Sequence, residues 1–183
     1  MQTIKAAVCH EFGAPLVIEE VQLAPPGRGE VEVALDAVAI CHSDISYAEG
    51  AWGGHLPAVY GHEAAGLISS VGEGVQGFAE GDSVVVTLIR SCGTCPSCAG
   101  GKPTICETPH DTVNGPLKTA GGQPLDQAMA CGAFAEKVVV DQRQIVKIPA
   151  DMRKDAAALV SCGVITGVGA VVNAAQLRAG QDV

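Results

Sequence analysis

The sequence contains few aromatic residues and no cluster of positive charge. Only 3% of its 183 residues are Phe, Trp or Tyr, so the core must be built from Val, Ala, Ile and Leu. The sequence has 11 Lys and Arg residues and 20 Asp and Glu residues, which gives a net charge of −9. This balance argues against nucleic acid or an anionic membrane as the main partner.

Long apolar runs are also missing from the printed sequence. The first residues lack the apolar segment of a secretory signal, and no apolar stretch of membrane-spanning length is evident. A length of 183 residues with 48% hydrophobic content suffices for one domain with a proper core. We therefore expect a soluble, cytoplasmic protein with neither a nucleic-acid nor a membrane partner.

Four of the eight cysteines stand in one short run, SCGTCPSCAGGKPTIC, with the spacing C-x2-C-x2-C-x7-C. Zinc takes four such ligands in a tetrahedron, and closely spaced cysteines can supply them from one loop. The predicted ligands are Cys92, Cys95, Cys98 and Cys106. Because the protein would fill all four positions, this zinc would be structural, and the chemistry would lie elsewhere.

Two other interpretations of these thiols are weaker. An iron–sulfur run would have a shorter last gap followed by Pro, whereas here Glu107 follows a gap of seven. Disulfides would need an oxidising compartment, which nothing else in the sequence indicates. Two further cysteines, Cys9 and Cys131, are interpreted as free packing thiols.

The chain before residue 150 is a succession of short apolar or alternating stretches separated by Gly- and Pro-containing turns. This pattern is typical of strands in a β-barrel or sandwich. The predicted strands are 3–10, 16–23, 30–38, 64–72, 83–89 and 133–140. Residues 48–60 are expected to form an irregular surface loop.

The character of the sequence changes after Pro149. An Ala-rich run near 156–159 and a second run at about 166–177 predict two helices. Gly180 follows the second run as a plausible C-cap. The chain then reaches Val183, which resembles the first residue of another strand.

Three more potential metal ligands stand where a strand or helix meets a turn: Cys41, His62 and Cys162. From spacing alone, a buried Cys or a lone His is more often a packing residue than a ligand. The donor set favours a metal, because two thiolates and one imidazole with an open fourth position form a known catalytic zinc site.

Together these motifs resemble the zinc-containing alcohol dehydrogenases of the medium-chain dehydrogenase/reductase type. The matching segments are Cys41-His42-Ser43-Asp44, Gly61-His62-Glu63, the four-Cys run and residues 161–167. The resemblance implies a mainly β fold, a GroES-like partly open barrel, with a catalytic domain at 1–150 that carries the zinc lobe at 91–106. Residues 151–183 would form a helical linker towards a Rossmann domain that is absent from this chain.

The resemblance also implies a role for each matching residue. Cys41, His62 and Cys162 would hold the catalytic zinc, which acts as a Lewis acid on the alcohol. Ser43 would take the alcohol proton, and Asp44 would orient the zinc-bound imidazole. Glu63 would lie beside the metal.

Four further residues match positions that contact cofactor or substrate in the family. His42 would contact the cofactor pyrophosphate and Thr166 the nicotinamide, while Trp52 and Leu88 would line the substrate cleft. On their own, all four residue types commonly have only structural roles. One departure concerns the proton relay, because Ser46 stands where many members carry a histidine.

The resulting hypothesis is oxidation of an alcohol to an aldehyde or ketone, or the reverse, by hydride transfer to NAD or NADP. It requires two zincs per chain, a small-molecule alcohol or aldehyde, and a full-length enzyme that is a homo-oligomer, and this part alone would be inactive. A glutathione-adduct formaldehyde dehydrogenase and an aryl-alcohol enzyme both remain open. The alternative from another class is a non-enzymatic zinc-stabilised β-domain with only the four-Cys site.

Overall fold

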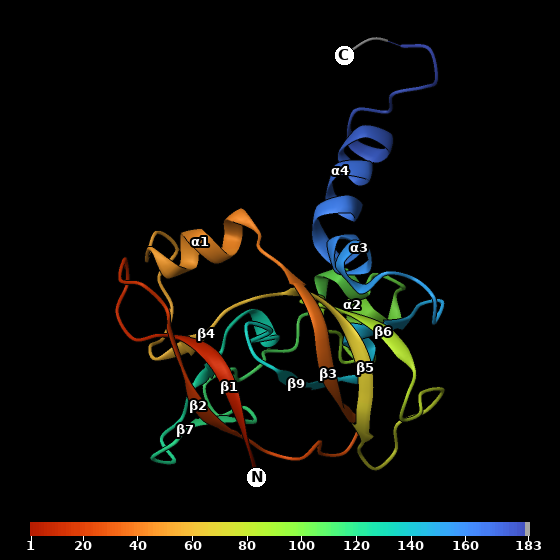
Figure 1. Ribbon diagram of the computed structural model, residues 1–183. Helices are drawn as coiled ribbons and strands as arrows, with labels where there is room; N and C mark the ends of the chain where they lie inside the picture. Colours follow the sequence, from red (N-terminus) through yellow and green to blue (C-terminus); the bar gives the residue numbers. More distant parts are fainter. Residues whose placement is uncertain (182–183) are drawn as a thin grey trace.

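Two five-stranded sheets wrap around a shared interior in the computed structural model, which describes residues 1–181 (Figure 1). The first sheet has the order β7(Leu117–Thr119), β2(Val17–Leu23), β1(Gln2–Cys9), β4(Ala58–Val59), β8(Asp126–Gln127). The second has the order β10(Ile145–Lys147), β6(Ser83–Thr87), β5(Glu63–Val71), β3(Glu30–Ala39), β9(Lys137–Asp141). All pairings are antiparallel except β4 with β8, which supports the predicted mainly β, GroES-like barrel.

Backbone hydrogen bonds connect the two sheets just before β9. Ala7 N donates to Phe134 O at 2.8 Å, and Glu136 N donates to Lys5 O at 3.0 Å. The interior is filled mainly by valine, and the clusters on the two sheets are continuous through β9, whose Val139 belongs to one cluster and Val138 to the other. β-Branched side chains pack well on pleated surfaces, which explains how so few aromatic residues suffice for the core.

The first five predicted strands correspond to β1, β2, β3, β5 and β6. The strand expected at 133–140 begins only at Lys137, because the preceding residues form bends and one isolated bridge, that of Ala135 with Ala6. A helix that the sequence did not predict, α1(His42–Ala48), follows β3 directly. The expected loop at 48–60 contains β4 near its end.

One long helical run leaves the barrel at its C-terminal end (Figure 1). It consists of α3(Lys154–Leu159), η4(Val160–Val164), α4(Ile165–Gly169) and η5(Ala170–Ala174), where η4 and η5 are π-helical. The prediction of two separate helices was therefore wrong. The run ends at Ala174 and Gln176 has a φ of 53°, so the predicted cap at Gly180 does not close it. The strand expected at Val183 lies outside the described residues.

The joined run also corrects an expectation about apolar length. By length and composition alone, Lys154–Ala174 is long and apolar enough to cross a membrane. The expectation of no stretch of that length was wrong, because the two predicted helices join without a break. Near its start, Ala157 and Ala158 are buried against β5 and β6. Several apolar side chains further along are exposed: Val164, Ile165, Val168, Val171 and Val172.

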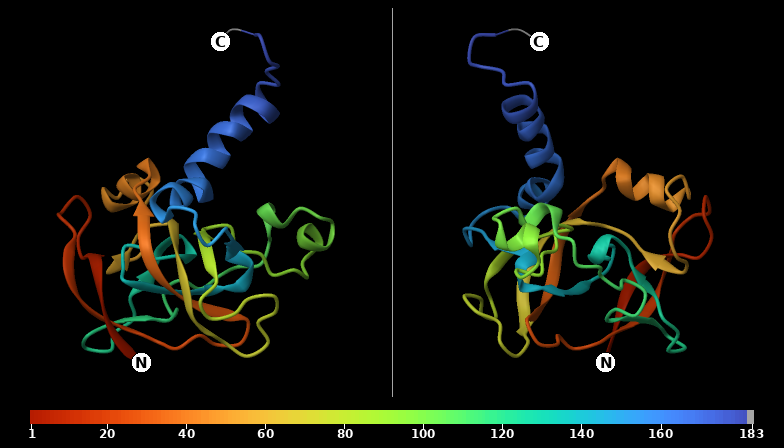
Figure 2. Two further views of the ribbon diagram at one scale, coloured as in Figure 1. Left: turned by 45° about the vertical axis from the view of Figure 1, so that its right-hand side comes forward. Right: turned by 180° about the vertical axis from the view of Figure 1, so that it is seen from behind.

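The four-Cys lobe projects sideways from the barrel (Figure 2). It contains only two short helical turns, α2(Pro96–Ala99) and the 3₁₀ turn η1(Pro103–Ile105), and neither has a buried residue. Two further 3₁₀ turns, η2(Ala128–Ala130) and η3(Gln142–Gln144), flank β9. The lobe is thus attached to the barrel without an apolar core of its own.

A buried carboxylate in β3 ties four strands together at one end of the barrel. Glu32 accepts hydrogen bonds from Lys137 Nζ at 2.8 Å, from Ser69 Oγ at 2.7 Å and from the amide of Gln2. Burial raises the pKa of Glu32. The hydrogen bonds from Lys137, Ser69 and Gln2, together with the positive charge of Lys137, outweigh burial and hold the pKa below its ordinary value.

Replacement Glu32→Gln is expected to lower the free energy of unfolding by about 1.5–3 kcal/mol at pH 7, because it removes charge-assisted hydrogen bonds from a buried network. The pKa of Glu32 is lower in the folded protein than in the unfolded chain, where it is about 4.3. Its carboxylate therefore stabilises the fold fully above about pH 4.3, and this stabilisation is lost as the pH falls through the pKa of the folded protein. The difference between variant and wild type should therefore shrink between pH 5 and pH 3, as measured by urea unfolding. The exposed Glu20→Gln is the control. Equal stability of Glu32→Gln and wild type at pH 7 would contradict the prediction.

Candidate metal centres

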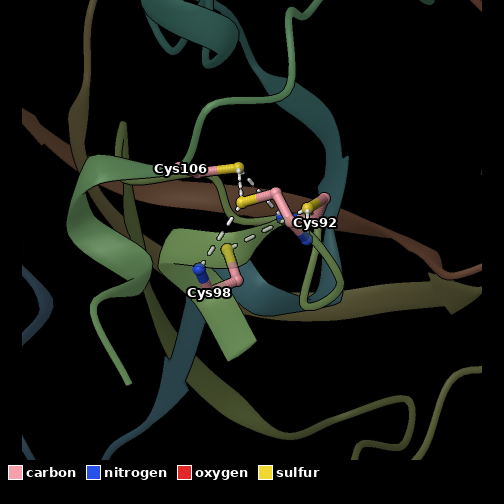
Figure 3. A group of neighbouring side chains, drawn as sticks. Cys92, Cys98 and Cys106 are labelled. Atoms are coloured by element: carbon pink, nitrogen blue, oxygen red, sulfur yellow. Dashed lines mark hydrogen bonds between the residues drawn. The ribbon is translucent and has the colours of Figure 1, made fainter. Parts of the chain in front are cut away.

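The four sulfurs of the lobe converge on one point, with all ligand atoms within 4.8 Å of one another (Figure 3). The Sγ atoms of Cys92 and Cys98 are 4.0 Å apart, and those of Cys95 and Cys106 are 3.9 Å apart. Four sulfurs each ~2.3 Å from a tetrahedral zinc would be about 3.8 Å apart. The predicted four-Cys set therefore fits a zinc ion in both donor type and spacing.

Backbone N–H groups inside the lobe point at its sulfurs. Cys92 Sγ accepts from the N–H groups of Cys95 at 3.2 Å and Thr94 at 3.3 Å. Together with the Thr108 hydroxyl, which contributes most, these bonds lower the pKa of Cys92 to about 5. Burial raises the pKa of Cys98 to about 11. The loop thus already stabilises a thiolate, the form in which cysteine binds metal.

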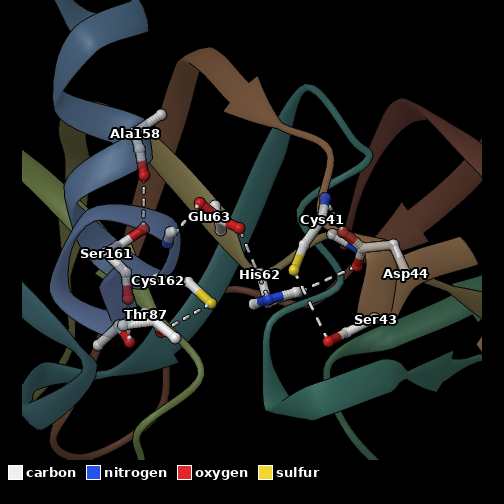
Figure 4. Close-up of polar contacts among 12 residues, drawn as sticks. Cys41, Ser43, Asp44, His62, Glu63, Thr87, Ala158, Ser161 and Cys162 are labelled. Atoms are coloured by element: carbon white, nitrogen blue, oxygen red, sulfur yellow. Dashed lines mark hydrogen bonds and ion pairs between the residues drawn. The ribbon is translucent and has the colours of Figure 1, made fainter. Parts of the chain in front are cut away.

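A second group of metal-binding side chains forms where three distant segments meet (Figure 4). Cys41 lies between β3 and α1, His62 and Glu63 lie at the start of β5, and Cys162 lies in η4. One ligand atom from each of these four residues lies within 4.8 Å of the others. The structure thus brings together the three predicted ligands, and Glu63 with them.

Asp44 holds the first two of these segments together. It is 2% exposed, and its Oδ1 lies 3.0 Å from His62 Nδ1 and accepts from Gly61 N at 3.0 Å. Its Oδ2 accepts from Cys41 N at 2.9 Å. Because Nδ1 donates to Asp44, the lone pair of Nε2 on the other side of the ring is free for a metal.

The environment of His62 Nε2 also fits a bound metal. This nitrogen is buried and has no hydrogen-bond partner among residues 1–181, although buried polar atoms are normally paired. The nearest carboxylate oxygen, Glu63 Oε1, is 4.0 Å away, and Glu63 Oε2 accepts from Gly163 N at 3.1 Å. A cation between two thiols and this imidazole would satisfy the orphaned nitrogen.

Local backbone geometry places the ligands on either side of this point. Gly61 has a φ of +93°, and a Cβ there would lie 2.7 Å from Phe134 N, so only glycine fits before His62. Cys162 stands in the π-helical segment η4, a geometry that often marks functional sites. Burial, followed by the charge of Glu63, raises the pKa of Cys162 to about 11.

The other predicted residues lie at different distances from this group. Ser43 Oγ is 3.7 Å from Cys41 Sγ, beside the metal ligands. Thr166 Oγ1 is 4.0 Å from Cys162 Sγ on an exposed helix face. His42 is exposed, and its Nδ1 lies 3.2 Å from Ser46 Oγ.

A cavity of about 340 Å³ lies between the barrel and the four-Cys lobe, and none of the four residues of the second ligand group lines it. Leu88 lines it, whereas Trp52 does not and instead packs against Tyr47 with ring centroids 5.2 Å apart. The predicted place of both residues in a substrate cleft stays a prediction. Sequence reasoning missed two lining residues, Tyr47 and Met129. Nothing in the sequence signals either residue, because Tyr47 lies on α1, which was not predicted, and Met129 lies in an irregular turn.

Comparison with known proteins agrees with this geometry. The family described as "Alcohol dehydrogenase GroES-like domain" matches residues 27–150. One relative is S-(hydroxymethyl)glutathione dehydrogenase of Komagataella pastoris, which is 37% identical over 98% of this chain and 49% of the relative. Another is alcohol dehydrogenase class-3 of Drosophila melanogaster, which is 38% identical over 97% of this chain and 49% of the relative. The chain spans about half the length of these relatives.

Solved structures match over nearly the whole chain. An alcohol dehydrogenase zinc-binding domain protein from Burkholderia ambifaria superposes with a TM-score of 0.90 at 33% identity, over 99% of this chain and 51% of that one. Benzyl alcohol dehydrogenase from Acinetobacter calcoaceticus superposes with a TM-score of 0.85 at 29% identity, over 95% of this chain and 49% of that one. With two converging ligand sets on a GroES-like barrel, the chain belongs to the alcohol dehydrogenase GroES-like domain family.

Proposed function

We propose that this chain is the metal- and substrate-binding half of a zinc-dependent alcohol dehydrogenase that exchanges hydride between an alcohol and NAD or NADP. The observation that carries the proposal is the second ligand group, in which two thiols lie beside the imidazole of His62, whose buried Nε2 has no hydrogen-bond partner among residues 1–181. This donor set with a free position is typical of catalytic rather than structural zinc. A non-enzymatic β-domain with one zinc would leave that nitrogen unexplained.

The chain's own residues can bind and orient the reactants. Zinc, when held by Cys41, His62 and Cys162, supplies Lewis-acid polarisation of the alcohol oxygen. Asp44 fixes the tautomer and orientation of the imidazole. The hydroxyl of Ser43, 3.7 Å from Cys41 Sγ, takes up the alcohol proton.

From Ser43 the proton must reach solvent without the relay histidine. His42 is exposed and hydrogen-bonded to Ser46, so its ring is held at the protein surface, where it can contact a cofactor phosphate. Water therefore carries the proton outward in this proposal. Glu63 is held by Gly163 N with its second oxygen towards His62, and lies ready to approach the metal.

The proposal also assigns the parts of the chain to two roles. Residues 1–150 form the catalytic domain, and 151–183 lead to a dinucleotide-binding domain against which the exposed apolar face of the long helix packs. Thr166 on that face would meet the nicotinamide. Hydride transfer needs both halves, because the acceptor must be held against the reacting carbon. A cytoplasmic location and a homo-oligomeric full-length enzyme stay predictions.

Metal content tests the proposal directly. The metal-replete chain is expected to hold two zincs, and Cys41→Ser to hold one, because the four-Cys lobe is independent of the second group. Elemental analysis with intact mass on the same sample gives the ratio. Cys9→Ser, a buried cysteine outside both groups, is the matched control and should retain two. One zinc in the wild-type chain, unchanged in Cys41→Ser, would support the non-enzymatic alternative.

A further inference from the structure

The three predicted ligands of the second group are not held in the same way. Asp44 accepts hydrogen bonds from Cys41 N and lies 3.0 Å from His62 Nδ1, so one carboxylate fixes two of the ligands. The third ligand, Cys162, lies outside the barrel strands, in the π-helical segment η4 of the long helix. Its thiol must therefore be directed towards the other two by different contacts.

Both peptide groups beside Cys162 are bound by side chains of the barrel (Figure 4). Thr87 Oγ1 donates to Ser161 O at 3.2 Å, and Glu63 Oε2 accepts from Gly163 N at 3.1 Å. Thr87 and Glu63 are directly opposite each other in the pairing of β5 with β6, so their side chains lie on the same face of the sheet. Two neighbouring residues thus hold the backbone on both sides of one ligand.

The irregular helical turn explains why the carbonyl of Ser161 needs another donor. In a regular α-helix, Ser161 O would accept from Ile165 N, but here Ile165 N donates to Cys162 O. The hydroxyl of Thr87 takes the place of that donor. Because Ser161 is only 5% exposed, bulk water has little access to its backbone. The bond therefore stabilises the turn from which Cys162 projects.

The hydroxyl of Thr87 is itself held in one direction. Its oxygen accepts from Ile89 N at 3.3 Å, which leaves its single hydrogen for Ser161 O. The carbonyl of Thr87 accepts from Gln144 Nε2 at 3.1 Å, and the same amide donates to Ala130 O at 2.9 Å. These bonds attach Thr87 to the barrel, so that it serves as a fixed point for the helix.

The attachment of the long helix does not depend on this bond alone. Ala157 and Ala158 are buried in an apolar cluster with residues of β5 and β6. Ser161 is the last buried residue of the helical run at 154–174, and the ligand follows it directly. Loss of the Thr87 hydroxyl should therefore be felt at the metal more strongly than in the packing of the helix.

Resting on the proposed function, we propose that Thr87 is a positioning residue for the second ligand group. Its hydroxyl and the carboxylate of Glu63 hold the backbone around Cys162 and direct that thiol towards Cys41 and His62. Thr87 acts through the carbonyl of Ser161 and not as a ligand of the metal.

Two substitutions of Thr87 test this role by competition with a chelator. Thr87→Val keeps the shape of the side chain without its hydroxyl, and should weaken zinc binding at the second group by about tenfold, the low end of the effect of partners that orient metal ligands. The zinc of the four-Cys lobe should keep its affinity. Thr87→Ser retains the hydroxyl and should bind both zincs as the wild-type chain does. Thr3→Val, at an exposed threonine in β1, is the matched control.

Cobalt in place of zinc gives a readout that a loss of stability alone would not move. Absorption bands of thiolate-bound cobalt depend on the geometry of its ligands. The difference between the spectra of the cobalt-loaded wild-type chain and Cys41→Ser isolates the second group. These bands should shift in Thr87→Val, because the direction of the Cys162 thiol changes, and should return to their wild-type positions in Thr87→Ser.

The outcomes separate this inference from the proposed function. Wild-type zinc affinity and unchanged cobalt bands in Thr87→Val would overturn the inference and leave the proposed function standing. Equal losses in Thr87→Val and Thr87→Ser would also overturn it, because the hydroxyl would then be irrelevant. Loss of both zincs in Thr87→Val would overturn it too, since the hydroxyl would then support the whole fold. If the wild-type chain held no second zinc, the proposed function would fall, and the inference with it.

Discussion

Replacing Cys98 with serine is expected to abolish zinc binding in the four-Cys lobe and to unfold residues 91–106 while the barrel stays folded. No residue in this stretch is buried, so no apolar core can hold it without metal. Structural zinc contributes about 10–16 kcal/mol of apparent binding free energy in zinc-finger peptides, and this energy is folding energy. The barrel keeps its own valine core and should survive the loss.

The measurement is amide hydrogen exchange across the lobe, followed by mass spectrometry. Protection at residues 91–106 should fall at least about 100-fold in Cys98→Ser, with the exchange of β1, β3 and β5 unchanged. Outside the metal cluster, the hydrogen bonds that Ser97 N and Oγ donate to Glu107 remain. If they sufficed, a zinc-free Cys98→Ser would keep its protection, and the prediction would be wrong. Cys9→Ser should retain both zinc and protection.

The four-Cys lobe could be predicted from sequence because its geometry is local. Its ligands span 15 residues, and spacing alone brings the sulfurs together once glycines allow the loop to turn. The second group was different, because positions 41, 62 and 162 meet only in the folded barrel. Their chemistry suggested a catalytic set, but the resemblance to a family, rather than spacing, grouped them.

The features that the sequence did not indicate have physical reasons. α1 is only seven residues long and begins without a Ser, Thr, Asp or Asn cap, since its N-cap is Cys41. The gap expected between the helical runs at 156–159 and 166–177 is absent because the π-helical segment η4 carries the helix through residues 160–164. Met129 adopts a conformation favoured by glycine, so its place in the cavity wall depends on tertiary packing alone.

Asp44→Asn is expected to weaken zinc binding at the second group by about 10–100-fold. The carboxylate accepts bonds from Cys41 N, Gly61 N and His62 Nδ1, so both oxygens must be acceptors. Asparagine has the same shape but only one acceptor oxygen, and its amide N–H₂ would face at least one N–H donor. A buried donor left unsatisfied costs about 1–3 kcal/mol. Loss of a group that hydrogen-bonds to a metal ligand typically lowers the metal affinity about 10–100-fold.

Competition with a chelator measures this loss, and the four-Cys lobe provides an internal reference in the same molecule. Only the zinc that Cys41→Ser loses should weaken in Asp44→Asn, while the lobe zinc keeps its affinity. Asp36→Asn, an exposed aspartate in β3, is the matched control because it makes the same chemical change away from both groups. Unchanged affinity in Asp44→Asn would mean that His62 and Cys41 hold their geometry without the carboxylate. A loss at both zincs would instead indicate general destabilisation, because the hydrogen bonds of Asp44 within residues 1–181 go to Cys41, Gly61 and His62 and not to the lobe.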